Sequence, residues 1–291
     1  MNLQPWSYTT SAQITLRGWH SIPSGKPVLH FLHGNGFCGR VYTPLLEYLS
    51  ADYDLWLCDI QGHGDSDAGT KFLGWNPNAE LAVEAFQAQR QMFFNAPIYA
   101  VAHSFGGVLT SLIMAKHPQL FRAAVLLDPV IYTPTLQLIM KSSEHLGLTV
   151  NKMAKRTRTR RSHWPHRQAA YAGLMGRGAF NGWTAESLAS FVDYALRPAD
   201  EGGVQLKCPV ELEATIFSSA PSGLWSALGK VQTPTLFLYG AKSFPFVLKS
   251  AALWAKRNSY VQAEQVVGGH CFMQEYPEAT AQRVGEFLRS V

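Results

Sequence analysis

The segment 98–107 constrains the fold of this chain more strongly than any other. It begins with the apolar run IYAVAH, and the residues after Ser104 carry a helical pattern as far as His117. A strand that passes into a helix without a loop forces a sharp, strained turn, which needs small neighbours such as Ala102 and Gly106. We therefore predict that Ser104 stands at the end of a strand, with its hydroxyl exposed above the edge of a sheet.

Other short apolar runs alternate with helical patterns along the chain. The predicted strands cover 28–32, 54–59, 98–102, 123–128, 235–239 and 261–267, and the clearest helices cover 78–94, which Asn76-Pro77 would begin, and 105–117. This alternation predicts an α/β fold with a mostly parallel central sheet flanked by helices.

The alternation stops between about 130 and 229. Little strand pattern is present there, and several short helices are expected, one of them over 185–196 with Thr184 as its N-cap. We interpret this stretch as an insertion between two strands of the sheet. The predicted domains are thus a core, formed by 1–130 and 230–291, and a helical cap over 131–229.

The composition places the chain among globular proteins. Apolar residues make up 47% of the 291 residues and charged residues 15%. No apolar run approaches the roughly 20 residues of a membrane-spanning helix, and the N-terminal residues lack the pattern of a signal peptide. We therefore expect a cytoplasmic protein. The four cysteines match the spacing of neither a metal site nor a disulfide framework.

The net charge of +5 is concentrated in one stretch. Between Glu144 and Glu186 there is no acidic residue, but there are eight basic ones: Lys152, Lys155, Arg156, Arg158, Arg160, Arg161, Arg167 and Arg177. The simplest interpretation is a solvated face of the cap helices. Weak contact with anionic membranes, or with acidic substrates, is the alternative. Nucleic-acid binding is not expected, because no binding module accompanies the charge.

A glycine-rich loop follows the first predicted strand. The run His33-Gly-Asn-Gly-Phe-Cys-Gly39 contains G-x-G-x-x-G, and Asp59 closes the next strand 20 residues later. This spacing is also typical of a dinucleotide-binding fold. Against that interpretation, His33 precedes the glycines, and Asp59 begins the separate pattern Asp-Ile-Gln-Gly-His-Gly-Asp-Ser66.

A histidine follows the last predicted strand. Gly268-Gly269-His270 lies on a loop from which the side chain can reach back over the sheet edge. Together with His33-Gly-Asn-Gly, the Asp59 pattern and Ala-His-Ser104-Phe-Gly-Gly, it resembles the α/β-hydrolase superfamily, in the order of that family's motifs. The resemblance implies the α/β-hydrolase fold, Ser104 as nucleophile and His270 as base. It also implies an oxyanion hole made by the backbone N–H groups of Asn35 and Phe105.

The sequence departs from the family pattern at the acid of the triad. That acid usually follows the strand predicted at 235–239, where this chain has Ser243, and no Asp or Glu occurs between Glu213 and Glu264. We predict that Asp128 replaces it, because the end of the 123–128 strand lies beside the nucleophile strand. Asp128-Pro129 could instead only begin a turn. Ser243→Ala is then expected to matter little.

A serine nucleophile favours acyl transfer over the chemistry of epoxide hydrolases and dehalogenases, which need a carboxylate there. The sequence therefore predicts a carboxylesterase or lipase-like hydrolase that forms an acyl-enzyme. No metal or organic cofactor is expected. The apolar cap predicts a small-molecule ester with an apolar acyl or alcohol group. A lactonase, thioesterase or carbon–carbon bond hydrolase remains open, as does a ligand-binding signalling protein without turnover.

Overall fold

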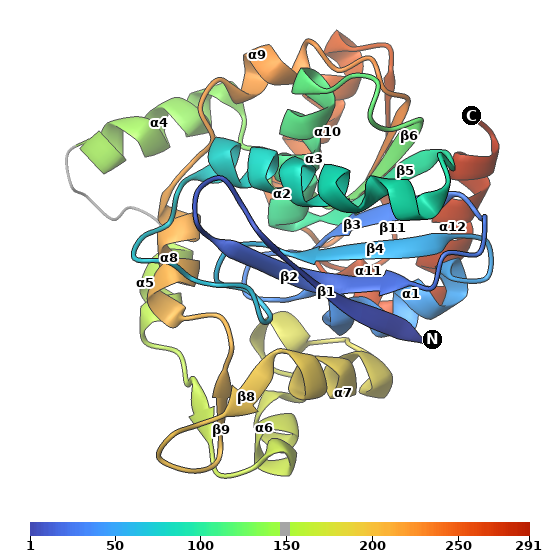
Figure 1. Cartoon of the computed structure of the whole chain (residues 1–291). Helices are drawn as coiled ribbons and strands as arrows, with labels where there is room; N and C mark the ends of the chain where they lie inside the picture. The colour runs from blue at the N-terminus through green and yellow to red at the C-terminus, as the bar shows by residue number, and fades with distance from the viewer. Residues whose placement is uncertain (146–151) are drawn as a thin grey trace.

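The computed structural model describes residues 1–145 and 152–291, so 146–151 of the predicted cap lie outside the described residues. Its centre is an eight-stranded sheet with the order β1–β2–β4–β3–β5–β6–β10–β11 (Figure 1). Strands β3 to β11 of this sheet run parallel, and β1 and β2 join one edge antiparallel. The strands are β1 (Leu3–Thr9), β2 (Thr15–Ser21), β3 (Val28–Leu32), β4 (Asp54–Asp59), β5 (Ile98–His103), β6 (Ala123–Leu127), β10 (Thr235–Gly240) and β11 (Val261–Val266). The predicted mostly parallel sheet flanked by helices is confirmed.

The central strands are buried on both faces. In β5, Ala100 and Ala102 belong to one apolar cluster, and Tyr99 and Val101 belong to another. This alternation follows from the two-residue period of a strand. Because helices cover both faces, the strand is a continuous apolar run in the sequence, which is why the sequence predicts it well.

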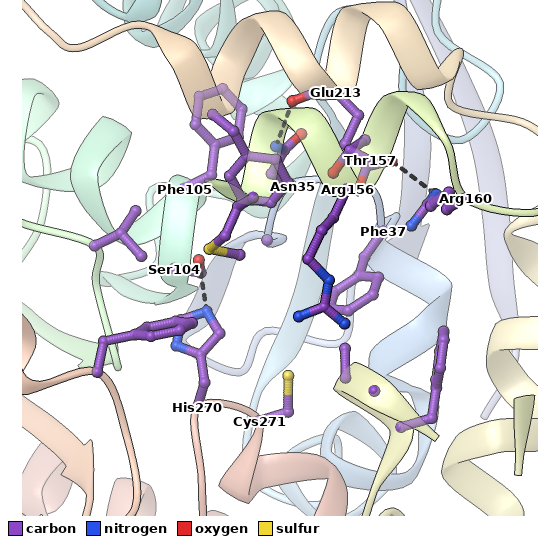
Figure 2. A pocket seen from close by; sticks show the side chains of 18 of the residues that line it. Asn35, Phe37, Ser104, Phe105, Arg156, Thr157, Arg160, Glu213, His270 and Cys271 are labelled. Carbon is purple, nitrogen blue, oxygen red and sulfur yellow. Dashed lines mark hydrogen bonds and ion pairs between the residues drawn. The ribbon is translucent and has the colours of Figure 1, made fainter. Parts of the chain in front are cut away.

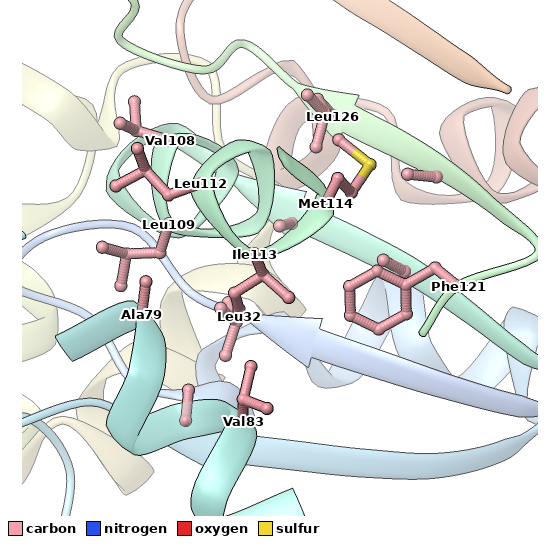
Figure 3. Close-up of a cluster of buried hydrophobic side chains, with 14 of the residues drawn as sticks. Leu32, Ala79, Val83, Val108, Leu109, Leu112, Ile113, Met114, Phe121 and Leu126 are labelled. Atoms are coloured by element: carbon pink, nitrogen blue, oxygen red, sulfur yellow. The ribbon is translucent and has the colours of Figure 1, made fainter. Parts of the chain in front are cut away.

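Two layers of helices sandwich the sheet (Figure 1). One apolar cluster contains residues of α2 (Trp75–Gln89), α3 (Ser104–Lys116), α9 (Leu224–Leu228) and α10 (Pro245–Arg257), and the other contains residues of α1 (Thr43–Leu49), α11 (Phe272–Glu275) and α12 (Pro277–Arg289). Helix α3 is buried almost all round, and Figure 3 shows its Ile113 beside Leu32 of β3 and Val83 of α2. This packing fixes the first turn of α3, which carries Ser104, against the sheet.

Some boundaries differ from the sequence prediction. Helix α2 begins at Trp75, with Gly74 as N-cap, and not after Asn76. The Asn76 side chain donates instead to the main-chain oxygen of Ser222. Strands β1 and β2 were not predicted, because they lie at the half-exposed edge of the sheet and are not continuously apolar.

Between β6 and β10 the described chain adds no strand to the central sheet. This stretch contains α4 (Pro134–His145), α5 (Lys152–Arg158), α6 (Arg167–Leu174), α7 (Ala185–Tyr194), α8 (Val210–Ser218) and α9. Thr184 caps α7 as predicted, accepting a hydrogen bond from the Ser187 N–H. The insertion also holds a small antiparallel sheet of β7 (His163–Trp164), β9 (Val204–Leu206) and β8 (Leu196–Pro198). Strands of two or three residues are too short to give a sequence pattern.

Candidate active site

Ser104 is the first residue of α3 and directly follows β5. Its φ of 52° lies in the left-handed region, which is strained for a residue with a side chain. Two glycines make the turn possible. A Cβ on Gly106 would lie 2.4 Å from the main-chain oxygen of Leu32, and one on Gly107 would lie 2.7 Å from the Cβ of Pro129. The predicted strand–turn–helix around Ser104 is present, with the small residues where backbone and side chains crowd it.

The structure brings Ser104, His270 and Asp128 together. The Oγ atom of Ser104 lies 3.0 Å from Nε2 of His270 (Figure 2). Nδ1 of the same ring lies 2.6 Å from Oδ2 of Asp128. With Nδ1–H donating to the carboxylate, Nε2 is free to accept the Ser104 hydroxyl proton. Asp128 is fully buried, whereas the His270 side chain is 23% exposed. The three side chains therefore form one hydrogen-bonded series that leads from the interior to the cavity.

Asp128 directly follows β6 and has a left-handed backbone, with φ of 49°. Its Oδ1 atom accepts the Gly240 N–H at 2.8 Å, and its Oδ2 atom accepts the Ser243 hydroxyl as well as His270. Strand β6 lies between β5 and β10, so the carboxylate reaches the loop after β10, where the family usually carries its acid. Ser243 thus holds Asp128 by a hydrogen bond, a contact that the sequence did not indicate.

Asn35 and Phe105, the two predicted oxyanion residues, line the same cavity as Ser104. Phe105 is the second residue of α3, and the N–H groups of a first helical turn have no carbonyl one turn earlier in the helix. Asn35 lies in the loop after β3, and its side-chain amide donates to the main-chain oxygen of Glu213 at 3.0 Å (Figure 2). A second contact fixes this loop, because the Gly36 N–H donates to Nε2 of His63 at 3.0 Å.

A buried series of hydrogen bonds connects the loop after β3 to the loop that carries His270. The Gly34 N–H donates to the Tyr42 hydroxyl at 3.0 Å, and that hydroxyl lies 2.6 Å from Nδ1 of His103. Nε2 of His103 is 3.0 Å from the main-chain oxygen of His270. Burial, with a smaller contribution from nearby His270, holds the pKa of His103 well below its usual range. A neutral ring can accept from Tyr42 and donate to His270.

The sequence analysis did not predict these hydrogen bonds of Tyr42 and His103. The one available signal was His103 itself, a polar residue that ends an otherwise apolar strand directly before Ser104. Its partners are far away in sequence, because Tyr42 lies 61 residues earlier and His270 lies 167 residues later. No local pattern connects such residues.

The carboxylate of Asp59 contacts its own chain. Its Oδ1 atom accepts the Gly39 N–H at 2.7 Å, and burial raises its pKa to about 7. The side chain is therefore committed to the glycine-rich loop and does not project toward a ribose, which argues against the dinucleotide-binding alternative. Two further acids of the next loop make ion pairs: Asp65 with Lys207, and Asp67 with Arg17.

Ser104 and His270 open onto a cavity of about 1470 Å³. This volume exceeds the roughly 300–1,000 Å³ of common small-molecule sites. Much of the wall comes from the insertion. Six of the eight basic residues of its charged stretch line the cavity: Lys152, Arg156, Arg158, Arg160, Arg161 and Arg177. Five of these six, all except half-buried Arg160, are also exposed, so the solvated face of the cap borders the cavity.

Comparisons with known proteins identify the family of the chain. A family model described as the alpha/beta hydrolase family matches residues 31–283. The chain is 25% identical to a pimeloyl-[acyl-carrier protein] methyl ester esterase of Chromobacterium violaceum, over 74% of this chain and 76% of the esterase. It is also 25% identical to the type I acyl-CoA thioesterase mpaH of Penicillium roqueforti, over 61% of this chain and 42% of that protein.

Solved structures extend the likeness to the whole fold. The crystal structure of E-2-(acetamidomethylene)succinate hydrolase superimposes with a TM-score of 0.80 at 22% identity, covering 99% of this chain and all of that one. At this identity the superposition is evidence for the fold alone. The family match covers most of the chain, including the segments that carry Ser104 and His270. The chain belongs to the alpha/beta hydrolase family.

Proposed function

We propose that this protein is a serine hydrolase that cleaves carboxylic esters through a Ser-His-Asp triad and an acyl-enzyme. The observation that carries the proposal is the continuous series from Ser104 Oγ to His270 Nε2 (3.0 Å) and from His270 Nδ1 to Asp128 Oδ2 (2.6 Å). An unassisted serine hydroxyl is a weak nucleophile, and an adjacent base oriented by a buried carboxylate activates it.

In the proposed reaction, Ser104 attacks the ester carbonyl while His270 takes its proton. The carboxylate of Asp128 stabilises the imidazolium that forms. The N–H groups of Asn35 and Phe105 bind the oxyanion, for which each such donor contributes about 3–4 kcal/mol in other enzymes. His270 then returns the proton to the leaving alcohol, and water, activated by the same histidine, releases the acid from Ser104.

The cavity supports an ester with an apolar acyl or alcohol group. Its wall near the reacting residues is rich in rings, among them Phe37, Trp75, Phe105, Tyr132, Phe244 and Phe246. We further infer that the 131–229 insertion serves as a cap over Ser104. Residues from several of its elements line the cavity, among them Arg156 of α5, Phe191 of α7, Leu206 of β9 and Ile216 of α8.

A p-nitrophenyl ester series of increasing acyl length tests this function. We expect Ser104-dependent release of p-nitrophenol, with no release by Ser104→Ala, and labelling of the wild-type protein alone by a fluorophosphonate probe. Absence of both hydrolysis and labelling would contradict the proposal and favour a binding protein without turnover. Matched lactone, thioester and carbon–carbon bond substrates, compared by kcat/KM, separate the other acyl-transfer activities.

Two further proposals concern the location of the protein in the cell and its contact with membranes. None of the helices within residues 1–145 and 152–291 is long and apolar enough to cross a membrane, and we propose a cytoplasmic location, which cell fractionation tests. Weak contact of the basic stretch with anionic membranes predicts sedimentation with anionic vesicles that added salt weakens. Equal binding to neutral vesicles would count against such contact.

A further inference from the structure

Three of the four basic residues of α5 line the cavity that contains Ser104: Lys152, Arg156 and Arg158. This helix packs against α8, and its buried residues are Ala154 and Thr157. Arg156 lies next to this buried face and lines the cavity. Figure 2 shows its side chain extending from α5 into the space between His270 and Phe37. The cavity thus combines an aromatic wall with a guanidinium on the side opposite the nucleophile.

Several neighbouring cations are already paired. Nη2 of Arg160 lies 2.6 Å from Oε2 of buried Glu213, and Nε of Arg158 lies 3.0 Å from Oε1 of Glu211. Arg156 differs from them. Among the residues that the structure describes, its guanidinium has no hydrogen-bond or ion-pair partner. Of the three arginines at 156, 158 and 160, Arg156 is therefore the one available to a ligand.

Among the residues that the structure describes, no carboxylate pairs with Arg156. Glu213 and Glu275 are the acidic residues of the described cavity wall. Glu213 pairs with Arg160, and Glu275 accepts the Gly269 N–H at 2.9 Å. The same wall holds seven basic residues: Lys152, Arg156, Arg158, Arg160, Arg161, Arg177 and Lys242. Such an excess of one sign in a concave, partly apolar site attracts ligands of the opposite sign.

We propose that the substrate carries, besides its ester, an anionic group that pairs with Arg156. The planar guanidinium matches a carboxylate or a phosphate with two parallel hydrogen bonds, and either group fits the observations. The ester then lies at Ser104, the apolar chain lies along the aromatic wall, and the anion lies at α5. This inference rests on the proposed ester hydrolysis and specifies the substrate class of that same site.

The test compares p-nitrophenyl esters of matched acyl length. One ends in methyl, one in carboxylate and one in phosphonate, so that the two sources of negative charge are separated. For the wild-type protein we expect at least one anionic ester to have a kcat/KM about 10- to 100-fold above that of the neutral ester. Arg156→Gln removes this preference, mainly through KM, and leaves the neutral ester within about twofold.

Lys155→Gln is the matched control, since it removes the same charge from the same helix at a residue outside the cavity wall. It is expected to preserve the preference. Arg156→Lys is expected to restore part of it, because a point charge remains without the planar fork. Equal loss for charged and neutral esters in Arg156→Gln, or a wild-type preference for the neutral ester over both anionic ones, overturns the proposal.

A binding experiment tests this inference independently of the proposed ester hydrolysis. Calorimetry on Ser104→Ala compares monomethyl glutarate with methyl butyrate, which needs no turnover. Tighter binding of the anionic ester, lost in the double variant with Arg156→Gln, supports the anion site even if the wild type hydrolyses no ester. Ser104-dependent hydrolysis of the neutral ester with no anionic preference in either assay rejects the anion site and leaves the proposed function standing.

Discussion

The Nε2 atom of His103 lies 3.0 Å from the main-chain oxygen of His270. The residue before the proposed nucleophile is thus bonded to the loop that carries the proposed base. Tyr42 continues the connection, because its hydroxyl bridges His103 and the N–H of Gly34. Buried hydrogen bonds thus connect the loop after β3 to the loop that carries His270.

Removal of the bridging hydroxyl tests this positioning role. We expect Tyr42→Phe to lower kcat about 10- to 100-fold, because a displacement near 1 Å in a reacting group has such effects. KM for a neutral p-nitrophenyl ester is expected to stay nearly constant. Tyr53→Phe, in the same apolar cluster but away from Ser104, is the control. A change confined to KM, or an equal loss in the control, would reject the positioning role.

Asp128→Asn tests the proposed acid. The amide preserves size and can still accept the Gly240 N–H, but it cannot stabilise imidazolium by charge. We expect kcat to fall by about 10⁴-fold, as in other serine triads, with an unchanged circular dichroism spectrum. Asp67→Asn, which removes a carboxylate from an ion pair remote from the triad, serves as control. An unchanged kcat would remove Asp128 from the triad.

Ser243→Ala has a larger expected effect than the sequence alone suggests. The Ser243 hydroxyl donates to the Asp128 oxygen that also accepts His270. Loss of one such hydrogen bond costs about 1 kcal/mol, which corresponds to a roughly fivefold lower kcat. The Gly240 N–H still holds the other carboxylate oxygen. Steady-state kinetics check this value, and a loss as large as that of Asp128→Asn would contradict a supporting role.

His30 predicts a pH dependence of stability. Burial lowers the pKa of this histidine to about 3, and neither ring nitrogen has a hydrogen-bond partner among the described residues. The unfolded chain takes up this proton near pH 6.5 while the folded chain does not, so the free energy of unfolding decreases as the pH falls below 6.5.

His30→Leu removes this dependence. Relative to the wild type, the free energy of unfolding of the variant is expected to rise by about 1.4 kcal/mol more at pH 5.5 than at pH 7.5. Loss of the stacking of His30 on Trp56 contributes equally at both pH values and cancels. Urea denaturation measures both differences. Identical differences at the two pH values would show that His30 does not titrate in this way.

Much of the fold was predictable because the central strands are apolar throughout. The bounds of β3 and β4 agree with the prediction, since neither strand has an exposed face to interrupt its run. Strand β2 gave no such signal. It is only partly buried, and it contains Gly18, where a Cβ would lie 2.0 Å from the main-chain oxygen of Leu57. That requirement arises from a neighbouring strand and has no local signature.

The candidate site likewise contains residues that the sequence predicted and residues that it did not. Ser104 and His270 were predicted from the order of the family's motifs, and Asp128 from the expected place of its strand beside the nucleophile strand. The roles of Tyr42 and Arg156 depend on packing between elements distant in sequence. The charge of α5 was visible in the sequence, but its direction toward the cavity was not, because the helix is placed by its contact with α8.

Placement of Asp128 after β6 has a practical consequence for altering this protein. Ser104 and Asp128 both belong to the β5–α3–β6 unit, so the loop after β10 supplies no carboxylate to the proposed triad. That loop still borders the cavity through Lys242, Phe244 and Phe246. A library randomised at Lys242 and Phe246, with Ser243 and Phe244 kept because they contact Asp128 and His270, would explore new substrates while leaving the reactive groups untouched.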